Sequence, residues 1–363
     1  MDGFSRYNQI NIVPEDQHKM DFIFPWGTFA YQKLPFELKN AGSTFQRTMS
    51  YAFHDIKHIV QPYLDDLPAH SMCRVDHPIH LRAIFVHYRF YHICLNLHKC
   101  DFCVESGRLI GFIVSRRGIR VDPLMVEEIL NLPPPSTLHQ LQGLQGKENF
   151  LRRFIPDYAE ITLGFTWLLK KGYEFVWDTI TNKSFEALKL SLIPAPLLFP
   201  PDYSRDYFLY LASSDYTIGM VLVQEDDSHD EHVIYYLSRS LTPTETKYLH
   251  VEKMALAAIQ EVQCLRHYIL SRKTTVIANC NPMQHSLTRQ FLGGKYSKWI
   301  VILQEFYLEF ERSKSEKSLV FAELICDFPY YETENVVVDS LPDESLFLIS
   351  SDDIWYGDII IYL

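Results

Sequence analysis

The spacing of apolar and polar residues predicts a first part of the chain that mixes strands with short helices. Short apolar runs with period-two alternation are spread over residues 1–115. They end in an expected hairpin whose strands, 109–115 and 119–121, flank the turn Arg116-Arg117-Gly118. An arginine pair followed by glycine is polar and conformationally permissive, as a turn requires.

Helical periodicity follows this hairpin. A helix is predicted over residues 124–132 and is ended by the prolines at 133–135. Thr137 and Gln140 have capping-box spacing and predict the start of the next helix. The helix is expected to continue through Leu138, Leu141, Leu144, Leu151 and Phe154. A further helix is indicated by Phe185, Leu188 and Leu192.

A proline-rich segment, with prolines at 194, 196, 200 and 201, marks a domain boundary. Beyond it the pattern predicts three antiparallel strands, one long helix and a fourth strand. Their expected ranges are 207–214, 219–224 and 232–238 for the strands, about 243–270 for the helix, and 274–278 for the last strand. The chain is therefore predicted to be an α+β protein with more than one domain.

The most informative polar feature is Tyr63-Leu64-Asp65-Asp66, in which two carboxylates are adjacent at an expected tight turn. Adjacent aspartates repel each other and disfavour a strand. A solvated turn is one explanation. The other is a divalent cation, because carboxylate oxygens together with phosphates are the usual ligands of magnesium in nucleotidyl transfer.

The residues around this pair decide between the two explanations. Ordered motifs occupy residues 1–10, 34–46, 63–66, 95–102 and 110–115. In content, order and spacing they resemble the palm of a reverse transcriptase from gypsy-type LTR retrotransposons, especially those of plants. The resemblance extends from the first residue to about residue 330, and the order of strands and helix after residue 206 is similar to that of a ribonuclease H-like domain.

The resemblance implies a reverse-transcriptase palm without its fingers, a thumb-like connection and a ribonuclease H-like domain with a mixed sheet. The expected divisions are 1–122 for the palm, 123–195 for the connection, 196–330 for the ribonuclease H-like domain, and 331–363 for an acidic tail leading towards an absent integrase. The implied activity is RNA-directed DNA polymerisation by two-metal nucleotidyl transfer.

The resemblance also assigns roles to individual residues. Asp2, Asp65 and Asp66 match the ligands of two magnesium ions, for which manganese could substitute. Lys99 matches a lysine thought to protonate the leaving pyrophosphate. Tyr7 matches the aromatic ring that excludes a 2′-hydroxyl. Contacts with nucleotide, template or primer are implied for Phe36 and Gln46, and for the primer-grip residues Ile110, Gly111 and Phe112.

Several positions depart from the family pattern. Arg6 and Glu37 replace glycines where backbone should approach a ligand closely, and Asp21 replaces alanine in an apolar strand. Pro68 removes a backbone donor soon after the aspartates. The chain begins at the motif of Asp2, so the cations of the fingers are expected to be missing. These departures predict weak polymerase activity or none.

The second domain is expected to lack ribonuclease H activity. Asp215 and Glu323 fit the first and fourth of the family's acidic residues, whereas Met254 and Asn279 occupy the second and third positions. Two neutral residues leave too little negative charge to hold two divalent ions. Asp215 and Glu323 would then be relics.

Composition agrees with a folded chain. Of the 363 residues, 47% are hydrophobic and 14% are aromatic, and the net charge is −11. Residues 323–363 contain ten acidic residues and no Lys or Arg, so most of the net charge comes from the tail and does not exclude nucleic-acid binding. The chain has no apolar run long enough for a membrane span and no room for a secretory signal before Asp2.

Partners and alternatives follow from these observations. The resemblance implies a primer with an RNA or DNA template, deoxynucleotides, no membrane, and the integrase and protease of the same polyprotein. It implies a cytoplasmic location, in virus-like particles, or a nuclear one. The rival hypothesis is a catalytically inactive nucleic-acid-binding remnant or pseudogene product. A structural metal site is a remote third hypothesis, built on His92, Cys94, His98, Cys100 and Cys103; the seven scattered cysteines suit a reducing compartment.

Overall fold

A computed structural model describes residues 1–36, 38–156, 158–170, 172–194, 196–280 and 295–312. The chain divides into two compact units, Met1–Leu109 and Ile110–Ile354, the second described as far as residue 312. Each unit has its own hydrophobic core. No helix among the described residues has the length and apolar character needed to cross a membrane. The four-part division expected from the sequence stays a prediction.

The first unit contains more helix than strand. Its elements are η1 (Arg6–Gln9), α1 (Pro14–Gln17), η2 (His18–Met20), β1 (Asp21–Phe24), β2 (Gly27–Ala30), α2 (Ala41–Ala52), η3 (His54–Ile56), α3 (His77–Phe90), η4 (Leu97–Lys99) and β3 (Ser106–Leu109). Helices α2 and α3 bury Phe45, Met49, Ile84 and Tyr88 together with Phe53. Strands β1 and β2 form an antiparallel hairpin with mostly exposed side chains.

The second unit begins with the hairpin β4 (Phe112–Ser115) and β5 (Gly118–Val121), as predicted. The helical segment that follows contains α4 (Pro123–Leu130), α5 (Leu138–Leu151), η5 (Arg152–Phe154), α6 (Tyr158–Thr166), η6 (Trp167–Leu169) and α7 (Thr179–Leu192). Asp122 caps α4 by accepting from Leu124 N at 3.1 Å. The Thr137 hydroxyl accepts from Gln140 N, which is one half of the expected capping box. The side-chain Oε1 of Gln140 accepts from Ser136 N, and not from Thr137 N as the other half requires.

The remaining strands form one five-stranded mixed sheet in the order β10-β9-β6-β7-β8. The antiparallel strands β6 (Tyr207–Ser213), β7 (Thr217–Glu225) and β8 (Glu231–Ser240) agree with the sequence pattern, as does β9 (Thr274–Ala278). Strand β9 is parallel to β6, and β10 (Leu308–Arg312), which the sequence pattern did not predict, is parallel to β9. The α+β prediction with a mixed second sheet is therefore confirmed.

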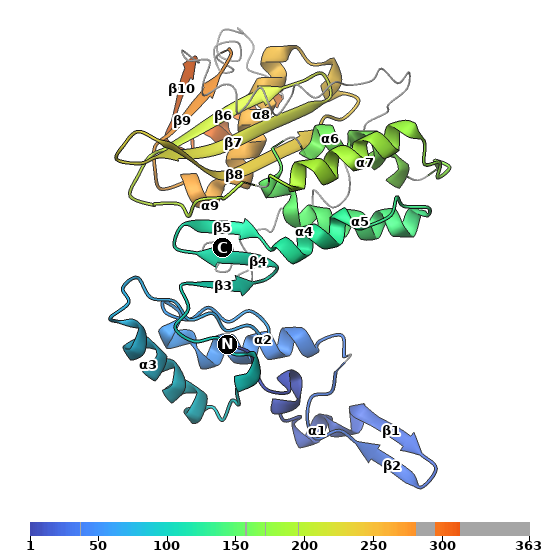
Figure 1. The fold of residues 1–363 in the computed structure, drawn as a ribbon, viewed down its shortest axis with the longest axis vertical. Helices are drawn as coiled ribbons and strands as arrows, with labels where there is room; N and C mark the ends of the chain where they lie inside the picture. The colour runs from blue at the N-terminus through green and yellow to red at the C-terminus, as the bar shows by residue number, and fades with distance from the viewer. Residues whose placement is uncertain (37, 157, 171, 195, 281–294, 313–363) are drawn as a thin grey trace. The chain divides into compact units, whose positions relative to one another are not determined.

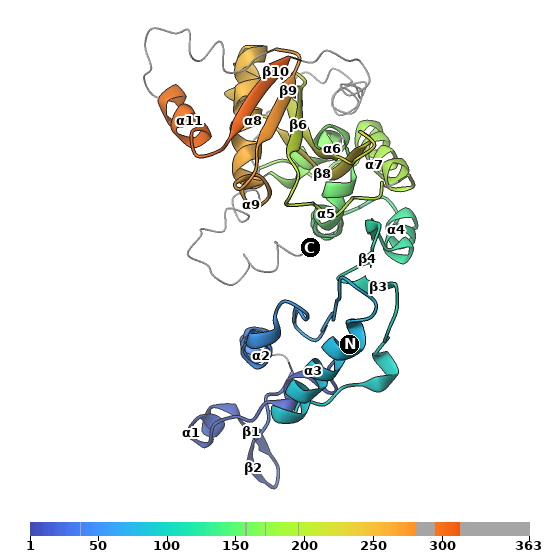
Figure 2. The same ribbon diagram turned by 90° about the vertical axis from the view of Figure 1, so that its left-hand side faces the viewer.

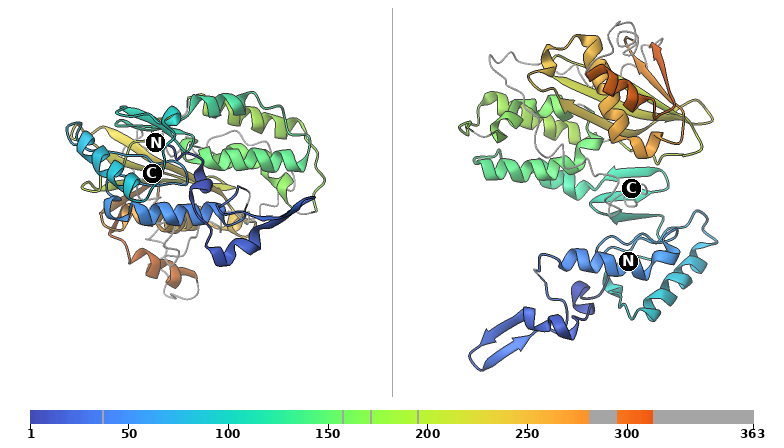
Figure 3. Two further views of the ribbon diagram at one scale, coloured as in Figure 1. Left: turned by 90° about the horizontal axis from the view of Figure 1, so that it is seen from below. Right: turned by 180° about the vertical axis from the view of Figure 1, so that it is seen from behind.

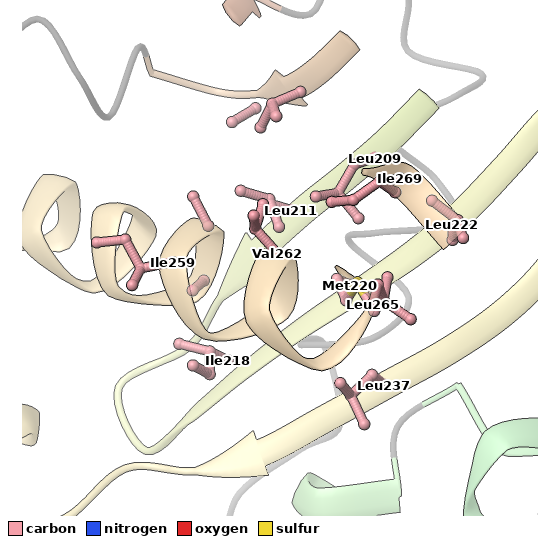
Figure 4. Packing of buried hydrophobic residues seen from close by; sticks show 14 of the residues in the cluster. Leu209, Leu211, Ile218, Met220, Leu222, Leu237, Ile259, Val262, Leu265 and Ile269 are labelled. Atoms are coloured by element: carbon pink, nitrogen blue, oxygen red, sulfur yellow. The ribbon is translucent and has the colours of Figure 1, made fainter. Parts of the chain in front are cut away.

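Helices cover both faces of this sheet, because side chains alternate along each strand. Leu209 and Leu211 of β6 pack with α8 (His250–Cys264), and Tyr210 and Ala212 face the core shared with α5, α6 and α7. Figure 2 shows α8 on one side of the sheet and α6 and α7 on the other, and Figure 3 shows α8 from behind. The close view in Figure 4 shows Ile259, Val262 and Leu265 of this region directed at the strands.

The single helix predicted over about 243–270 is wrong in detail. The structure has η7 (Glu245–Lys247), then α8, then the short α9 (Arg266–Ile269), with α11 (Lys295–Leu303) farther along the chain. Glu245 accepts from Thr242 N at 2.8 Å, which stabilises a local turn in place of helix. Glu252 then accepts from Leu249 N at 3.1 Å and satisfies a free amide at the start of α8.

Candidate active site

The two adjacent aspartates lie at a tight turn, as predicted. Tyr63 N donates to Asp66 O and Asp66 N donates to Tyr63 O, both at 2.9 Å. Leu64, inside the turn, has a φ of +51°, a left-handed conformation that is strained for leucine. Residues held in such conformations are concentrated at functional sites. The turn is therefore closed by two backbone hydrogen bonds and holds Leu64 in a strained conformation.

The opening segment pairs with this turn. Asp2 forms an antiparallel bridge with Asp66, and Gly3 N donates to Asp65 O at 3.3 Å. Residues directly opposite in such a bridge have Cα atoms about 4.5–5.5 Å apart and side chains on the same face. The fold thus brings together the backbones of all three predicted metal ligands, although 62 residues separate Gly3 from Asp65.

Gln46 fixes the aspartate turn. Its side chain is almost fully buried on α2, and its carbonyl accepts from Leu64 N at 2.5 Å. Its amide donates to Pro62 O at 2.9 Å and to Ser50 Oγ at 3.2 Å. The family resemblance predicts a contact between Gln46 and the nucleotide or template. The structure instead gives Gln46 a positioning role, because its side-chain amide is bonded to the backbone of Pro62 and Leu64 and to Ser50 Oγ.

Lys99 pairs with the first aspartate. Its ammonium Nζ lies 3.9 Å from Asp2 Oδ2, and the lysine side chain is 61% exposed while that of Asp2 is 16% exposed. The backbone of Asp2 is also held, because Asn96 N donates to Asp2 O at 2.9 Å and Asp2 N contacts Cys100 Sγ at 3.3 Å. Lys99 therefore lies next to the predicted catalytic carboxylates, on an exposed and adjustable side chain.

Three carboxylates are the donor set that hard divalent cations such as magnesium prefer. Asp2, Asp65 and Asp66 fit this requirement by chemistry, and their backbones are paired, but their three side chains do not converge into such a group in this structure. Within residues 1–280 and 295–312, apart from the few omitted positions, no group of three or more His, Cys, Asp or Glu side chains is arranged to hold a metal. This finding applies equally to the histidines and cysteines of residues 92–103.

Two of the predicted substrate contacts lie together. The Tyr7 ring meets the Phe36 ring edge to face at 5.4 Å between centroids, and it meets Phe45 at 5.5 Å. Phe45 is fully buried, whereas Phe36 is 49% exposed. Tyr7 is therefore held rigidly by the core on one side, next to an exposed aromatic ring on the other. Such a pair presents a fixed apolar wall to solvent.

The three predicted primer-grip residues differ from one another. Ile110 and Gly111 have positive φ values of 50° and 74°, so the backbone bends sharply before β4. Phe112 is 2% exposed, stacks on Phe150 at 4.5 Å between centroids, and lies under the Arg153 guanidinium at 4.4 Å. A direct contact between the Phe112 ring and nucleic acid is inconsistent with this burial, because the ring belongs to the core.

The departures from the family pattern have mild consequences where the structure describes them. Asp21 is exposed on β1, so its charge is solvated and not buried in an apolar strand. Pro68 O accepts from Gln61 N at 3.2 Å, but the reciprocal bond of such an antiparallel pair needs an N–H at position 68, which proline lacks. The expected penalty is therefore absent for Asp21 and limited to one lost backbone bond for Pro68. Glu37 lies outside the described residues, as does the side chain of Arg6.

The expected relic site in the second unit is occupied by a lysine. Asp215 lies in the turn between β6 and β7 with its side chain 94% exposed, and Lys253 Nζ is 3.8 Å from its carboxylate. The same ammonium donates to Asp215 O at 2.8 Å. Met254 is 1% exposed within the core against the sheet. Glu323 lies outside the described residues.

A buried carboxylate that the sequence pattern did not predict lies beside this turn. Glu160 of α6 accepts from Ser214 Oγ at 3.1 Å and from the Thr217 hydroxyl. Burial raises the pKa of the Glu160 carboxyl, and the two hydroxyl bonds partly oppose that rise. The signal was available, since Glu160 interrupts an apolar helical run. It links α6 to the β6–β7 turn.

Comparison with protein families agrees with these two units. Residues 1–114 match the family described as reverse transcriptase (RNA-dependent DNA polymerase), and residues 177–276 match the RNase H-like domain found in reverse transcriptase. Among solved structures, two of a foamy viral protease-reverse transcriptase are similar at 20% identity. The one in complex with double-stranded DNA has a TM-score of 0.76 and covers 86% of this chain and 56% of that one. The one in complex with an RNA/DNA hybrid has a TM-score of 0.73, with 94% and 46% covered.

The chain is also similar in sequence to transposon polyproteins. The Drosophila melanogaster Pol polyproteins from transposons 297 and opus are both 29% identical, over 86% and 91% of this chain. The Schizosaccharomyces pombe transposon Tf2-3 polyprotein is 26% identical over 85%. The chain spans only 29%, 34% and 24% of these relatives' lengths. This chain is therefore a reverse transcriptase region followed by an RNase H-like domain, of the kind found in retrotransposon Pol polyproteins.

Proposed function

We propose that the first unit is the palm of an RNA-directed DNA polymerase from a gypsy-type LTR retrotransposon of plants. The observation that carries this proposal is the bridge between Asp2 and Asp66, with Gly3 bonded to Asp65. It brings the opening motif to the aspartate turn in a chain whose residues 1–114 match the reverse transcriptase family. The nucleic acids bound by the foamy viral relatives support a primer–template as the partner.

Asp2, Asp65 and Asp66 would hold two divalent ions, magnesium or manganese, which when bound lower the pKa of the attacking primer hydroxyl and neutralise the leaving pyrophosphate. The chain's own side chains would do the rest. Gln46 keeps the aspartate turn in its strained conformation. Tyr7 and Phe36 would face the sugar of a deoxynucleotide and leave no room for a 2′-hydroxyl. Lys99, exposed beside Asp2, would move its proton to the pyrophosphate.

The test is magnesium-dependent primer extension by the 363-residue chain on an RNA template, which the departures from the family pattern predict to be slow. Asp65→Asn should lower extension at least about a hundredfold, as expected for loss of electrostatic stabilisation at the reacting centre. Asp55→Asn, at an exposed aspartate outside the motifs of this unit, is the matched control and should extend like the parent. Equal extension by the Asp65 and Asp55 variants would refute the proposed site.

A second candidate, an inactive nucleic-acid-binding protein, is favoured by the ion pair between Lys99 and Asp2. This pair partly neutralises a carboxylate that metal binding needs. The two candidates differ in Mn²⁺ binding, measured by electron paramagnetic resonance. A polymerase site binds Mn²⁺ in the parent and loses it in Asp65→Asn. An inactive protein shows no such difference and no extension, yet still binds a primer–template.

For the RNase H-like domain we propose a duplex-binding role without cleavage. Lys253 places an ammonium against the backbone and carboxylate of Asp215, where a metal would have to bind. Met254 offers only a buried thioether. A labelled RNA–DNA hybrid should stay intact in the presence of Mg²⁺ or Mn²⁺. Cleavage that disappears in Asp215→Asn would show that the domain is a hydrolase after all.

A further inference from the structure

The hairpin β4–β5 has three arginines within five residues, Arg116, Arg117 and Arg120, and all three are exposed. No hydrogen bond or ion pair joins their guanidinium groups to any residue that the structure describes. The one carboxylate at the hairpin's end, Asp122, is buried and caps α4. The hairpin therefore presents three positive charges with no acidic neighbour of its own.

The hairpin is held rigidly. Ser115 pairs with Gly118 across the turn, and Ser115 Oγ donates to Gly118 O at 3.1 Å. Ile119 exchanges two backbone hydrogen bonds with Leu198, at 2.8 and 3.0 Å. Phe199 N in turn donates to Val233 O of β8 at 2.8 Å. The arginines thus stand on a turn that is fixed to the five-stranded sheet, and binding a ligand there costs little backbone entropy.

We propose that Arg116, Arg117 and Arg120 form a surface that binds the sugar-phosphate backbone of a nucleic-acid duplex. Guanidinium groups bind phosphate in a bidentate way and stay charged at any physiological pH. Strand residues rise about 3.3 Å each, so a turn pair and a residue three positions on can reach two or three phosphates of one strand. The contact involves no base edges and is therefore independent of sequence.

This inference rests on the proposed function, because it assigns a binding surface for the primer–template of the same chain. The test is fluorescence anisotropy of a labelled RNA–DNA hybrid titrated with the full chain between about 50 and 200 mM KCl. The triple variant Arg116→Gln, Arg117→Gln, Arg120→Gln should bind about 10- to 100-fold more weakly at 0.1 M salt. The plot of the logarithm of the association constant against the logarithm of the salt concentration should become less steep, its negative slope decreasing in magnitude by about two to three.

The matched control removes the same charge elsewhere. Arg74, Arg82 and Arg89 are also exposed, with no side-chain hydrogen bond or ion pair to other described residues. Their triple Gln variant should keep the parent slope within about one unit. A triple Arg→Lys variant of the hairpin should also keep most of the slope, since it retains the charge. Circular dichroism and melting temperature should match the parent in every variant.

Each outcome decides the proposal. An unchanged slope in the hairpin variant, an equal loss in the control, or no binding by the parent would overturn it. Failure of the polymerase proposal gives a different result, because Asp65→Asn then leaves primer extension unchanged or the parent extends nothing. A parent that binds hybrid through the hairpin yet extends no primer would support the surface and reject the polymerase.

Discussion

At the residue scale, several side chains that resemble substrate contacts are structural. Gln46 bonds to Pro62 O just before the Tyr63–Asp66 turn and to Leu64 N inside it, and Phe112 lies in a core between Phe150 and Arg153. A sequence motif shows only that a given residue type occurs at a given position. Whether the side chain faces a ligand or the protein depends on which segment packs against it. The fold places the rings of Tyr7 and Phe36 in edge-to-face contact, while their predicted roles stay predictions.

Glu148 gives a prediction at this scale. Its carboxyl is buried on α5, where its bond partner is the Tyr158 hydroxyl at 3.4 Å. Burial raises its pKa from 4.5 to about 8. The folded state therefore keeps a proton that the unfolded state releases above about pH 4.5. Stability from this group is complete below pH 4.5 and is lost as the pH rises towards 8.

We expect Glu148→Gln to remove this loss. The free energy of unfolding of the second unit, from urea titrations at pH 5, 6.5 and 8, should shift in favour of the variant by about 1 kcal/mol per pH unit. Glu127→Gln, on the exposed side of α4, should follow the parent at every pH. Parallel curves for the parent and the Glu148 variant would contradict the buried acid.

At the element scale, local signals placed most helices and strands. Asp178 accepts from Ile180 N and Thr181 N at 3.0 and 2.8 Å, which fixes the start of α7. The β4–β5 turn depends on Gly118, whose φ is +138° and whose added Cβ would lie 2.1 Å from Leu198 O. The glycine is thus required by its conformation and by a neighbouring backbone.

Gly118→Ala should therefore destabilise the second unit by about 2–4 kcal/mol, because backbone must move and the positive φ is strained. The control is Gly146→Ala on α5, where an added Cβ meets nothing within 4 Å. It should stabilise the unit by about 0.5–1 kcal/mol, as alanine favours helix over glycine. Urea titration measures both. A Gly118 variant as stable as the parent would show that the turn relaxes freely.

At the scale of the whole molecule, the described chain consists of two units with separate cores. The first buries Phe45, and the second buries Leu211 between the sheet and α8. Because each unit has a hydrophobic core of its own, each is expected to unfold in its own cooperative transition.

Core truncations test this separation. Phe45→Ala should lower the protection of amides in residues 1–109, and Leu211→Ala that of amides in residues 207–278, each by about 2–5 kcal/mol. Hydrogen exchange read by mass spectrometry gives the stability of each segment in both variants. Equal losses in both segments from either substitution would mean that the units unfold together.

The sequence by itself determined the class of the fold, the strands β6 to β9, the tight turn at Asp65-Asp66 and the family resemblance. These features depend on local periodicity, on turn-forming residues and on the order of motifs, all of which can be read from residues that are neighbours in the sequence. It missed β10, whose strand is defined only by its parallel pairing with β9. It also missed the Glu160 link to Ser214 and the pairing of Lys253 with Asp215. Only the tertiary structure decided these, because each depends on contacts between residues far apart in the chain.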